Sequence, residues 1–161
     1  MKLTLYTDYG LRTLIALAVS PERRHTVTGI SAAYGISRNH LVKVVARLAD
    51  LGYVETTRGK GGGMRLARRP EEIRVGQVVR ELESGLGVVE CLGDDGAGCV
   101  ISPVCRLKGL FEDATQAFLA ALDGHTLAEL VKRRSSVARL LGIPVVVEEG
   151  PRPSGTAPPP A

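Results

Sequence analysis

The segment that decides the fold runs from Thr28 to Gly52 and reads TGISAAYGISRNHLVKVVARLADLG. Thr28 stands where a helix cap would stand and Gly35 is a typical helix terminator, so a short helix is expected between them. Ser37 then predicts the cap of a longer helix, which Gly52 ends. Two helices joined by a short turn with a glycine are typical of the helix-turn-helix motif, whose second helix enters the DNA major groove. The candidate DNA contacts are Thr28 and Ser37 at the helix starts and Arg38, Asn39, His40 and Lys43 on the second helix.

A glycine-rich hairpin is predicted directly after this motif. Residues 53–57 and 64–66 have strand-forming sequences, and residues 58–63, Arg-Gly-Lys-Gly-Gly-Gly, join them. Glycines let the backbone lie close to a phosphate or a groove wall, while the basic side chains supply charge. The loop lacks Walker spacing and a helix directly behind it, which argues against nucleotide binding. We interpret the hairpin as the wing of a winged helix, with DNA contacts at Arg58, Lys60, Gly61 and Gly62.

Helical patterns flank this unit on both sides. The apolar spacing over residues 11–18 predicts an amphipathic helix, capped by Asp8 or by Thr7, that ends at Ser20. Residues 75–83 predict a short helix whose valines pack on the winged-helix core. The expected fold is therefore mainly α with a small β wing: a winged helix-turn-helix plus a long dimerisation helix.

The long helix is expected to begin at Pro103 and to end near Gly124. Its apolar stripe is too extensive to face water, so we expect it to pack against a second copy of the chain in a homodimer. The alternative is that it covers the core of a monomer. A further helix is predicted over residues 126–134, with Thr126 as cap and Glu129 completing a capping box.

These patterns divide the chain into four parts. Residues 1–84 form the predicted DNA-binding domain and residues 85–105 a glycine-rich loop that holds the cysteines. Residues 106–140 carry the dimerisation helix and the C-terminal helix. The proline-rich residues 150–161 are expected to be a disordered tail.

Charge is distributed unevenly along the chain. Residues 1–69 hold 12 Lys and Arg against 4 Asp and Glu, whereas residues 70–161 hold 9 against 13. A basic N-terminal half favours a polyanionic partner such as double-stranded DNA, although a solubilising surface is the alternative. No apolar run approaches the length of a membrane span and the N-terminus does not resemble a signal peptide, so a cytoplasmic protein without membrane contact is expected.

The three cysteines, Cys91, Cys99 and Cys105, lie within or at the end of the glycine-rich loop. An odd number of cysteines, in a protein expected to be cytosolic, argues against a disulfide framework. Their spacing is wider than in a zinc knuckle, which disfavours zinc without excluding it, and small buried thiols are the structural alternative. An iron-sulfur cluster suits them better because its corners need ligands from separate directions. The missing fourth cysteine leaves a corner for an oxygen or nitrogen ligand, solvent or a small molecule.

The chain contains several short motifs that are unspecific individually but specific in combination. Over about residues 1–140 the chain resembles the small dimeric winged-helix regulators that carry iron-sulfur clusters, and within that family the branch that senses nitric oxide. The motifs that carry this resemblance are Leu3-Thr4, TDYGLR at 7–12, YGISRNH at 34–40, GYV at 52–54, RGKGGG at 58–63, VVRELE at 78–83 and CRL at 105–107.

This resemblance implies a ligand set. The three loop cysteines would bind the cluster, 4Fe-4S more readily than 2Fe-2S. An aspartate near the start of the first helix, supplied by the other subunit, would add oxygen ligation, and Asp8 matches it. From the residues alone Asp8 reads as a helix cap. The cluster-assembly branch instead uses a histidine three residues after its last cysteine, and Lys108 occupies that position here.

The expected function is that of an iron-sulfur-dependent transcriptional repressor that releases operator DNA when nitric oxide nitrosylates the cluster. The intact cluster would brace residues 85–103 against the partner's first helix and so fix the spacing of the two recognition helices. A regulator of the same fold that responds to cluster supply, oxygen or redox state is one alternative. A different alternative is a constitutive DNA-binding protein in which the cysteines hold structural zinc. No nucleotide motif or catalytic triad is present, so no enzyme is expected. His25, His40 and His125 are expected on surfaces or at the DNA, without metal.

Overall fold

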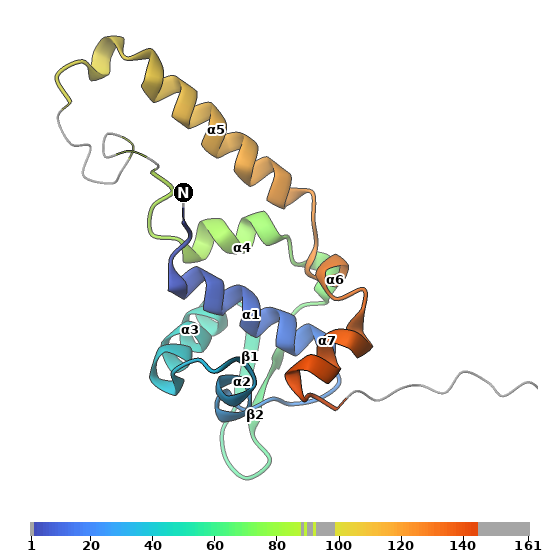
Figure 1. The fold of residues 1–161 in the computed structure, drawn as a ribbon. Coiled ribbons are helices and arrows are strands. Elements are labelled where there is room, and N and C mark those ends of the chain that lie inside the picture. The colour runs from blue at the N-terminus through green and yellow to red at the C-terminus, as the bar shows by residue number, and fades with distance from the viewer. Residues whose placement is uncertain (1, 88, 90–91, 93–98, 145–161) are drawn as a thin grey trace, which may run out of the picture.

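The computed structural model describes residues 2–87, 89, 92 and 99–144. A three-helix unit and a two-stranded hairpin form the body, and a long helix extends from it (Figure 1). This arrangement confirms the predicted fold class. In the described part of the chain no helix is both long enough and apolar enough to cross a membrane.

Helix α1 spans Leu5–Val19 and begins earlier than the sequence pattern indicated. Its cap is Thr4, whose side chain accepts a hydrogen bond from the backbone N–H of Thr7 at 3.3 Å. The prediction that Asp8 or Thr7 caps this helix is therefore wrong. The apolar pattern used for the prediction begins only at Leu11, after the first turns of α1, so it did not indicate where the helix starts.

Helices α2 (Val27–Tyr34) and α3 (Arg38–Asp50) form the helix-turn-helix. Thr26 caps α2 by accepting the Gly29 N–H at 3.0 Å, so the predicted cap Thr28 instead lies in the first turn. Gly35 ends α2 at φ 64°, a left-handed conformation that favours glycine, as predicted. Ser37 is the N-cap residue of α3, but its side chain makes no capping hydrogen bond.

The wing consists of β1 (Val54–Thr57) and β2 (Gly63–Leu66) in antiparallel register, with Val54 opposite Leu66. His25 extends this hairpin, because its backbone N–H and carbonyl both bond to Met64, at 2.8 and 2.7 Å. The loop before α2 is thereby fixed to the wing.

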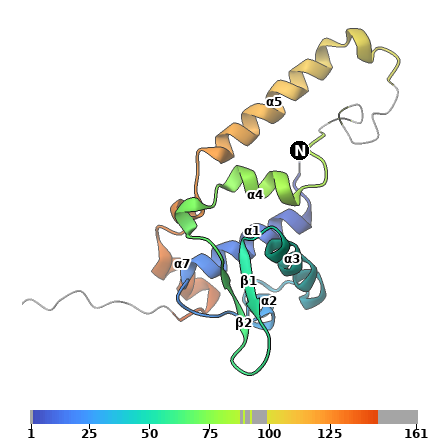
Figure 2. The same cartoon turned by 180° about the vertical axis from the view of Figure 1, so that it is seen from behind.

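Helix α4 (Val75–Leu82) lies across α1 and packs Val78, Val79 and Leu82 inward, as predicted. At its end Glu83 accepts hydrogen bonds from the Thr4 backbone N–H and hydroxyl, both at 3.1 Å. The start of α1 and the end of α4 are therefore adjacent, as Figure 2 also shows.

Helix α5 spans Arg106–Asp123. Pro103 lies in a separate 3-10 turn, Ser102–Val104, rather than at the start of α5, because the chain is extended at Cys105 between the two. The C-terminal end of α5 contacts α4, whereas its N-terminal end projects away from the body in both views (Figures 1 and 2).

The C-terminal region holds two short helices rather than one. These are α6 (Leu127–Leu130) and α7 (Arg134–Leu141). The predicted capping box is absent, since Thr126 makes no side-chain cap and the Glu129 carboxylate instead lies 2.8 Å from His125 Nδ1. Arg134 docks α7 by donating to the Val19 carbonyl at 3.1 Å. The expected tail at 150–161 lies outside the described residues.

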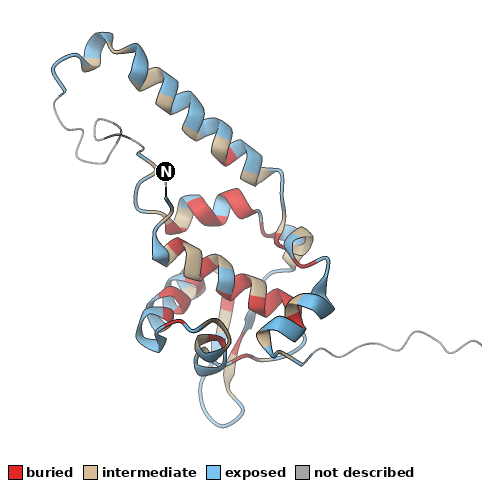
Figure 3. Cartoon of the chain, in the orientation of Figure 1, coloured by how far each residue is buried: buried red, intermediate tan, exposed pale blue. Residues whose placement is uncertain are grey.

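The hydrophobic core lies where α1 is covered by its neighbours (Figure 3). Leu14 and Leu17 of α1, Leu41 and Leu48 of α3, and Tyr53 before the wing are fully buried. Most of α5 is exposed in the single chain by comparison. The body therefore has its own core, and α5 adds little to it.

His25 is buried, with 8% of its surface exposed, which corrects the expectation that it lies on a surface. Its Nε2 lies 3.2 Å from the Ser20 carbonyl oxygen. Burial lowers the pKa of His25 below its ordinary value of 6.5, and Arg23 lowers it further, against the opposing effects of the Ser20 carbonyl and Glu22. The neutral ring is therefore favoured in the folded protein.

We expect a pH-dependent loss of stability from this histidine. The unfolded chain takes up a proton near pH 6.5, whereas the folded chain favours the neutral ring. The contribution of His25 to the free energy of unfolding is therefore fully present above that pH and is lost as the pH falls below it. One proton limits the slope to about 1.4 kcal/mol per pH unit. Urea unfolding from about pH 7.5 to 5.5 should show a smaller dependence of stability on pH in His25→Gln than in the wild type. An unchanged slope in His25→Gln would contradict this assignment.

Candidate functional site

The outer face of α3 presents the predicted recognition residues. Arg38, Asn39, His40 and Lys43 are all exposed, while Leu41, Val44 and Leu48 anchor the opposite face in the core. The alternation follows the helical period, which is why the sequence alone separated the two faces. His40 also stacks on Tyr9 of α1, with ring centroids 6.5 Å apart.

The wing loop is exposed and basic. Arg58, Lys60 and Gly61 are exposed, and Gly62 is half-buried beneath them. Gly61 has φ 80°, and a Cβ at Gly62 would lie 2.8 Å from the Gly59 carbonyl oxygen. The glycines are thus needed for the turn itself, and the two basic side chains stand at its tip.

An ion-pair network that the sequence analysis missed supports this wing. Arg24 donates to the Thr57 hydroxyl at 2.8 Å and lies 3.7 Å from Glu55, which also bonds Arg65 across the hairpin. Arg24 and Glu55 are too far apart in sequence for any local pattern to pair them. The network ties the loop before α2 to the wing. Thr28 lies exposed in the first turn of α2, beside that loop.

The described cysteines lie on either side of the 3-10 turn before α5. Cys99 is exposed and Cys105 is half-buried, and both are free thiols. The Ser102 N–H bonds to the Cys99 carbonyl at 2.9 Å, which keeps the intervening chain compact. Cys91 lies outside the described residues. Among the described residues, no three His, Cys, Asp or Glu side chains gather to hold a metal.

Asp8 lies in an exposed ion pair in the first turns of α1. Its carboxylate accepts from Arg12 Nε at 3.0 Å and lies 2.8 Å from Arg12 Nη2, and its side chain is 37% exposed. The Arg12 guanidinium also lies over the Tyr34 ring, 5.9 Å from its centroid. Asp8 is therefore not needed to cap the helix, and its carboxylate is accessible from outside the chain.

Apolar side chains stand exposed around the start of α5. Val104 is 82% exposed and Leu110 is 63% exposed, whereas Leu119 near the other end is buried. An exposed apolar surface of this kind is typical of sites that bind another molecule. The N-terminal half of α5 thus has the character of a surface that packs against another molecule.

A helix-turn-helix with an exposed polar recognition face, followed by a basic glycine-rich hairpin, defines a winged-helix protein. The chain belongs to the Rrf2 family, described as iron-dependent transcriptional regulators, whose family model matches residues 3–133.

Named relatives agree with this assignment. The chain is 51% identical over 142 residues to the HTH-type transcriptional regulator NsrR of Bacillus subtilis (strain 168), covering 88% of this chain and 97% of that protein. It is 49% identical, with the same coverage, to NsrR of Geobacillus kaustophilus. These names confirm the resemblance drawn from the motifs. Because the family and these relatives are transcriptional regulators, the chain is not an enzyme.

Solved structures share the fold. IscR of T. potens matches with a TM-score of 0.67 at 27% identity, covering 85% of this chain and 90% of that one. CymR, the global cysteine regulator of B. subtilis, matches with a TM-score of 0.64 at 27% identity, covering 83% of this chain and 98% of that one. The same fold thus carries regulators of different names, so the signal depends on site residues rather than on the fold.

Proposed function

We propose that this chain is a cytoplasmic, homodimeric repressor that binds operator DNA through its winged helix and releases it when nitric oxide reacts with a bound iron-sulfur cluster. The observation that carries this proposal is the joint presence of an exposed recognition face and two accessible thiols before α5 in a close relative of NsrR. The proposed division into a DNA-binding domain at 1–84, a cluster loop at 85–105 and a dimerisation region at 106–140 follows the same features.

The DNA-binding step uses side chains that have no role in the core. Arg38, Asn39, His40 and Lys43 are free to reach base edges or adjacent phosphates from α3. The wing loop offers Arg58, Lys60 and the backbone of Gly61 and Gly62 to the DNA backbone or minor groove. Ser37 and Thr28 are exposed at the starts of their helices, and each would donate a hydroxyl or backbone N–H hydrogen bond to a phosphate.

Dimerisation would cover the exposed apolar part of α5. Removing a leucine such as Leu110 from water stabilises an interface by about 1.5–3 kcal/mol. A symmetric pair also suits two recognition helices that must reach successive major grooves. The alternative, in which α5 covers a monomer core, is disfavoured because its N-terminal half projects from the body.

The donor set fits an iron-sulfur cluster. Cys91, Cys99 and Cys105 supply soft thiolate ligands, and Asp8 supplies an oxygen. The α5 end that follows Cys105 projects away from α1 of the same chain, which favours Asp8 of a second subunit as the partner ligand. When bound, the cluster, which we expect to be 4Fe-4S in preference to 2Fe-2S, would supply the iron with which nitric oxide reacts.

The weak ligand explains how the signal could reach DNA. An Asp8 that pairs only with Arg12 of its own helix, as in the described chain, would leave the cluster loop of the other subunit unattached to α1. That helix packs directly on α3, so a shift of α1 moves the recognition helix. A small change in half-site spacing is enough to reduce affinity for a two-fold operator.

The experiment that tests this function is anaerobic purification, with iron and sulfide analysis, followed by operator binding before and after nitric oxide. The proposal predicts a coloured, iron-loaded dimer that releases DNA on treatment. A colourless zinc protein with unchanged DNA binding would overturn the cluster and signal, and would leave the constitutive alternative. If oxygen or iron depletion releases the DNA while nitric oxide has no effect, the proposed signal is wrong and the proposed cluster stands.

Wing and recognition helix should contribute differently to DNA binding. Lys60→Ala is expected to weaken binding about equally for all sequences and to reduce the logarithmic salt dependence by about 1, because it removes one phosphate contact. Arg38→Ala should cost about 1–3 kcal/mol on the operator and relax sequence preference.

Fluorescence anisotropy at several salt concentrations, on operator and scrambled DNA, separates these effects. Lys132→Ala, at an exposed lysine between α6 and α7, is the matched control and should bind as the wild type does. Equal losses on both DNAs for Lys60→Ala and Arg38→Ala would contradict the assignment of base reading to α3.

A further inference from the structure

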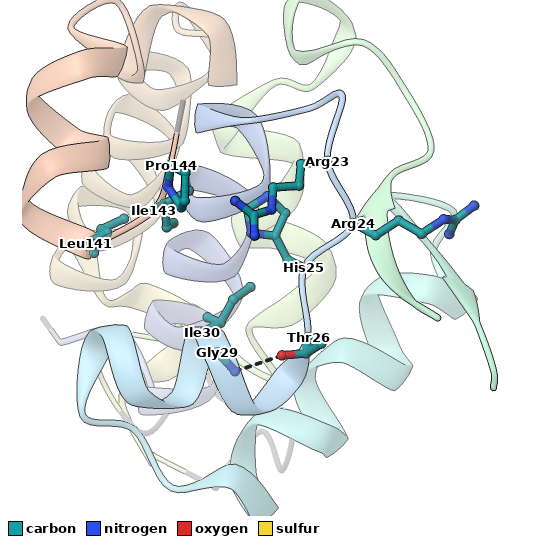
Figure 4. A pocket seen from close by; sticks show the side chains of 10 residues that line it. Arg23, Arg24, His25, Thr26, Gly29, Ile30, Leu141, Ile143 and Pro144 are labelled. Carbon is teal, nitrogen blue, oxygen red and sulfur yellow. Dashed lines mark hydrogen bonds between the residues drawn. The ribbon is translucent and has the colours of Figure 1, made fainter. Parts of the chain in front are cut away.

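A groove lies between the start of α2 and the end of the described chain (Figure 4). One wall is formed by the α1–α2 loop and the first turn of α2, and it includes Arg23, His25 and Gly29. The other wall is residues 141–144. The Ser20 hydroxyl donates to the Pro144 carbonyl at 3.0 Å, which fixes the chain end at the rim of this groove.

The groove has a positive character. Figure 4 shows Arg23 on the side that faces Ile143 and Pro144, while Arg24 points away toward the wing. The nearby acid Glu22 lies 3.6 Å from Arg134, so its charge is already matched. The N-terminal end of α2, with its partial positive charge, adds to that of Arg23.

The sequence after Pro144 complements this groove. Three valines, Val145 to Val147, are followed by Glu148 and Glu149. Four residues of extended chain reach about 13 Å from Pro144, enough to cross a groove that Pro144 itself lines. The valines match the apolar lining from the half-buried Leu141 and Ile143, and the two carboxylates match Arg23 and the α2 end.

We propose that residues 145–149 bind in this groove, with Glu148 and Glu149 against Arg23 and the first turn of α2, and that they compete there with a DNA phosphate. The competition rests on the proposed DNA binding, because the start of α2 belongs to the helix-turn-helix. The acidic segment thus reduces DNA affinity from within the same chain. If it occupies the groove about two-thirds of the time, removing its charge raises the affinity about threefold.

The test compares Glu148→Gln/Glu149→Gln with the full chain. A matched control deletes residues 151–161 and keeps both glutamates. In ¹⁵N NMR spectra the double variant should shift the backbone amide signals of Arg23 and Gly29, whereas the deletion should not. Operator affinity should rise about threefold in the double variant, and Arg23→Gln should abolish that difference.

The outcomes separate the segment from the DNA-binding proposal. Unshifted Arg23 and Gly29 signals in the double variant overturn the docking, whatever the DNA data show. Shifted signals with unchanged affinity support the docking and overturn the competition. Shifted signals in a protein that binds no DNA support the docking and overturn the proposed function instead.

Discussion

Cys105→Ser is expected to reduce bound iron at least about tenfold and to abolish the effect of nitric oxide on DNA binding. Serine keeps the size of the side chain but replaces a soft thiolate with a hydroxyl, which is a poor ligand for cluster iron. Cys105 is half-buried between the 3-10 turn and α5 and belongs to no core cluster, so the fold should survive. Iron and sulfide analysis of anaerobically purified protein measures the loss, with circular dichroism as a check on folding.

Two comparisons sharpen this experiment. Ser102→Ala changes the same turn without removing a thiol and should keep the wild-type iron content. Asp8→Asn should lose less iron than Cys105→Ser, because three thiolates remain, but it should make the cluster more sensitive to nitric oxide. Full iron content in Cys105→Ser would exclude this cysteine as a ligand.

Gly76→Ala is expected to lower the free energy of unfolding by about 1–3 kcal/mol and to weaken dimerisation. Gly76 lies where α4 meets the end of α5, and a Cβ there would stand 2.8 Å from Asp123 Cγ and 2.9 Å from the Asp123 backbone nitrogen. The backbone of Asp123 cannot swing aside, so α5 must shift. The shift also strains the Arg80–Asp123 ion pair, in which Nη1 donates to Oδ1 at 2.7 Å.

Gly109→Ala is the matched control for the loss of stability in this prediction, and not for dimerisation, because Gly109 lies in the proposed dimer surface of α5. It places the same substitution within α5, where a Cβ would meet no atom within 4 Å in the single chain. Alanine is the better helix former by about 1 kcal/mol, so this variant should be at least as stable as the wild type. Urea unfolding and sedimentation measure the two effects. Equal stability of the two variants would show that the α4–α5 approach is not constrained at Gly76.

Helix ends and helix caps differ in how well local sequence predicts them. Gly35 and Gly142 end their helices at φ 64° and 63°, and only the first was read from the sequence. Caps were harder to assign, because two neighbouring threonines at 26 and 28 offer the same hydroxyl and the backbone decides between them. The cap of α1 shows the same ambiguity, because Asp8 or Thr7 was predicted and Thr4 is the cap in the structure.

The sequence by itself determined the helix-turn-helix, the wing and the long α5, because helical period, turn glycines and strand alternation act between residues a few positions apart. It also identified the exposed face of α3 and the three cysteines as candidate site residues. Only the tertiary structure decided the contacts between distant residues. These include Thr4 with Glu83, Arg24 with Glu55, the Gly76 approach to Asp123, and the groove between Arg23 and Pro144. Such contacts depend on how separate elements pack, and no periodicity along the chain records that packing.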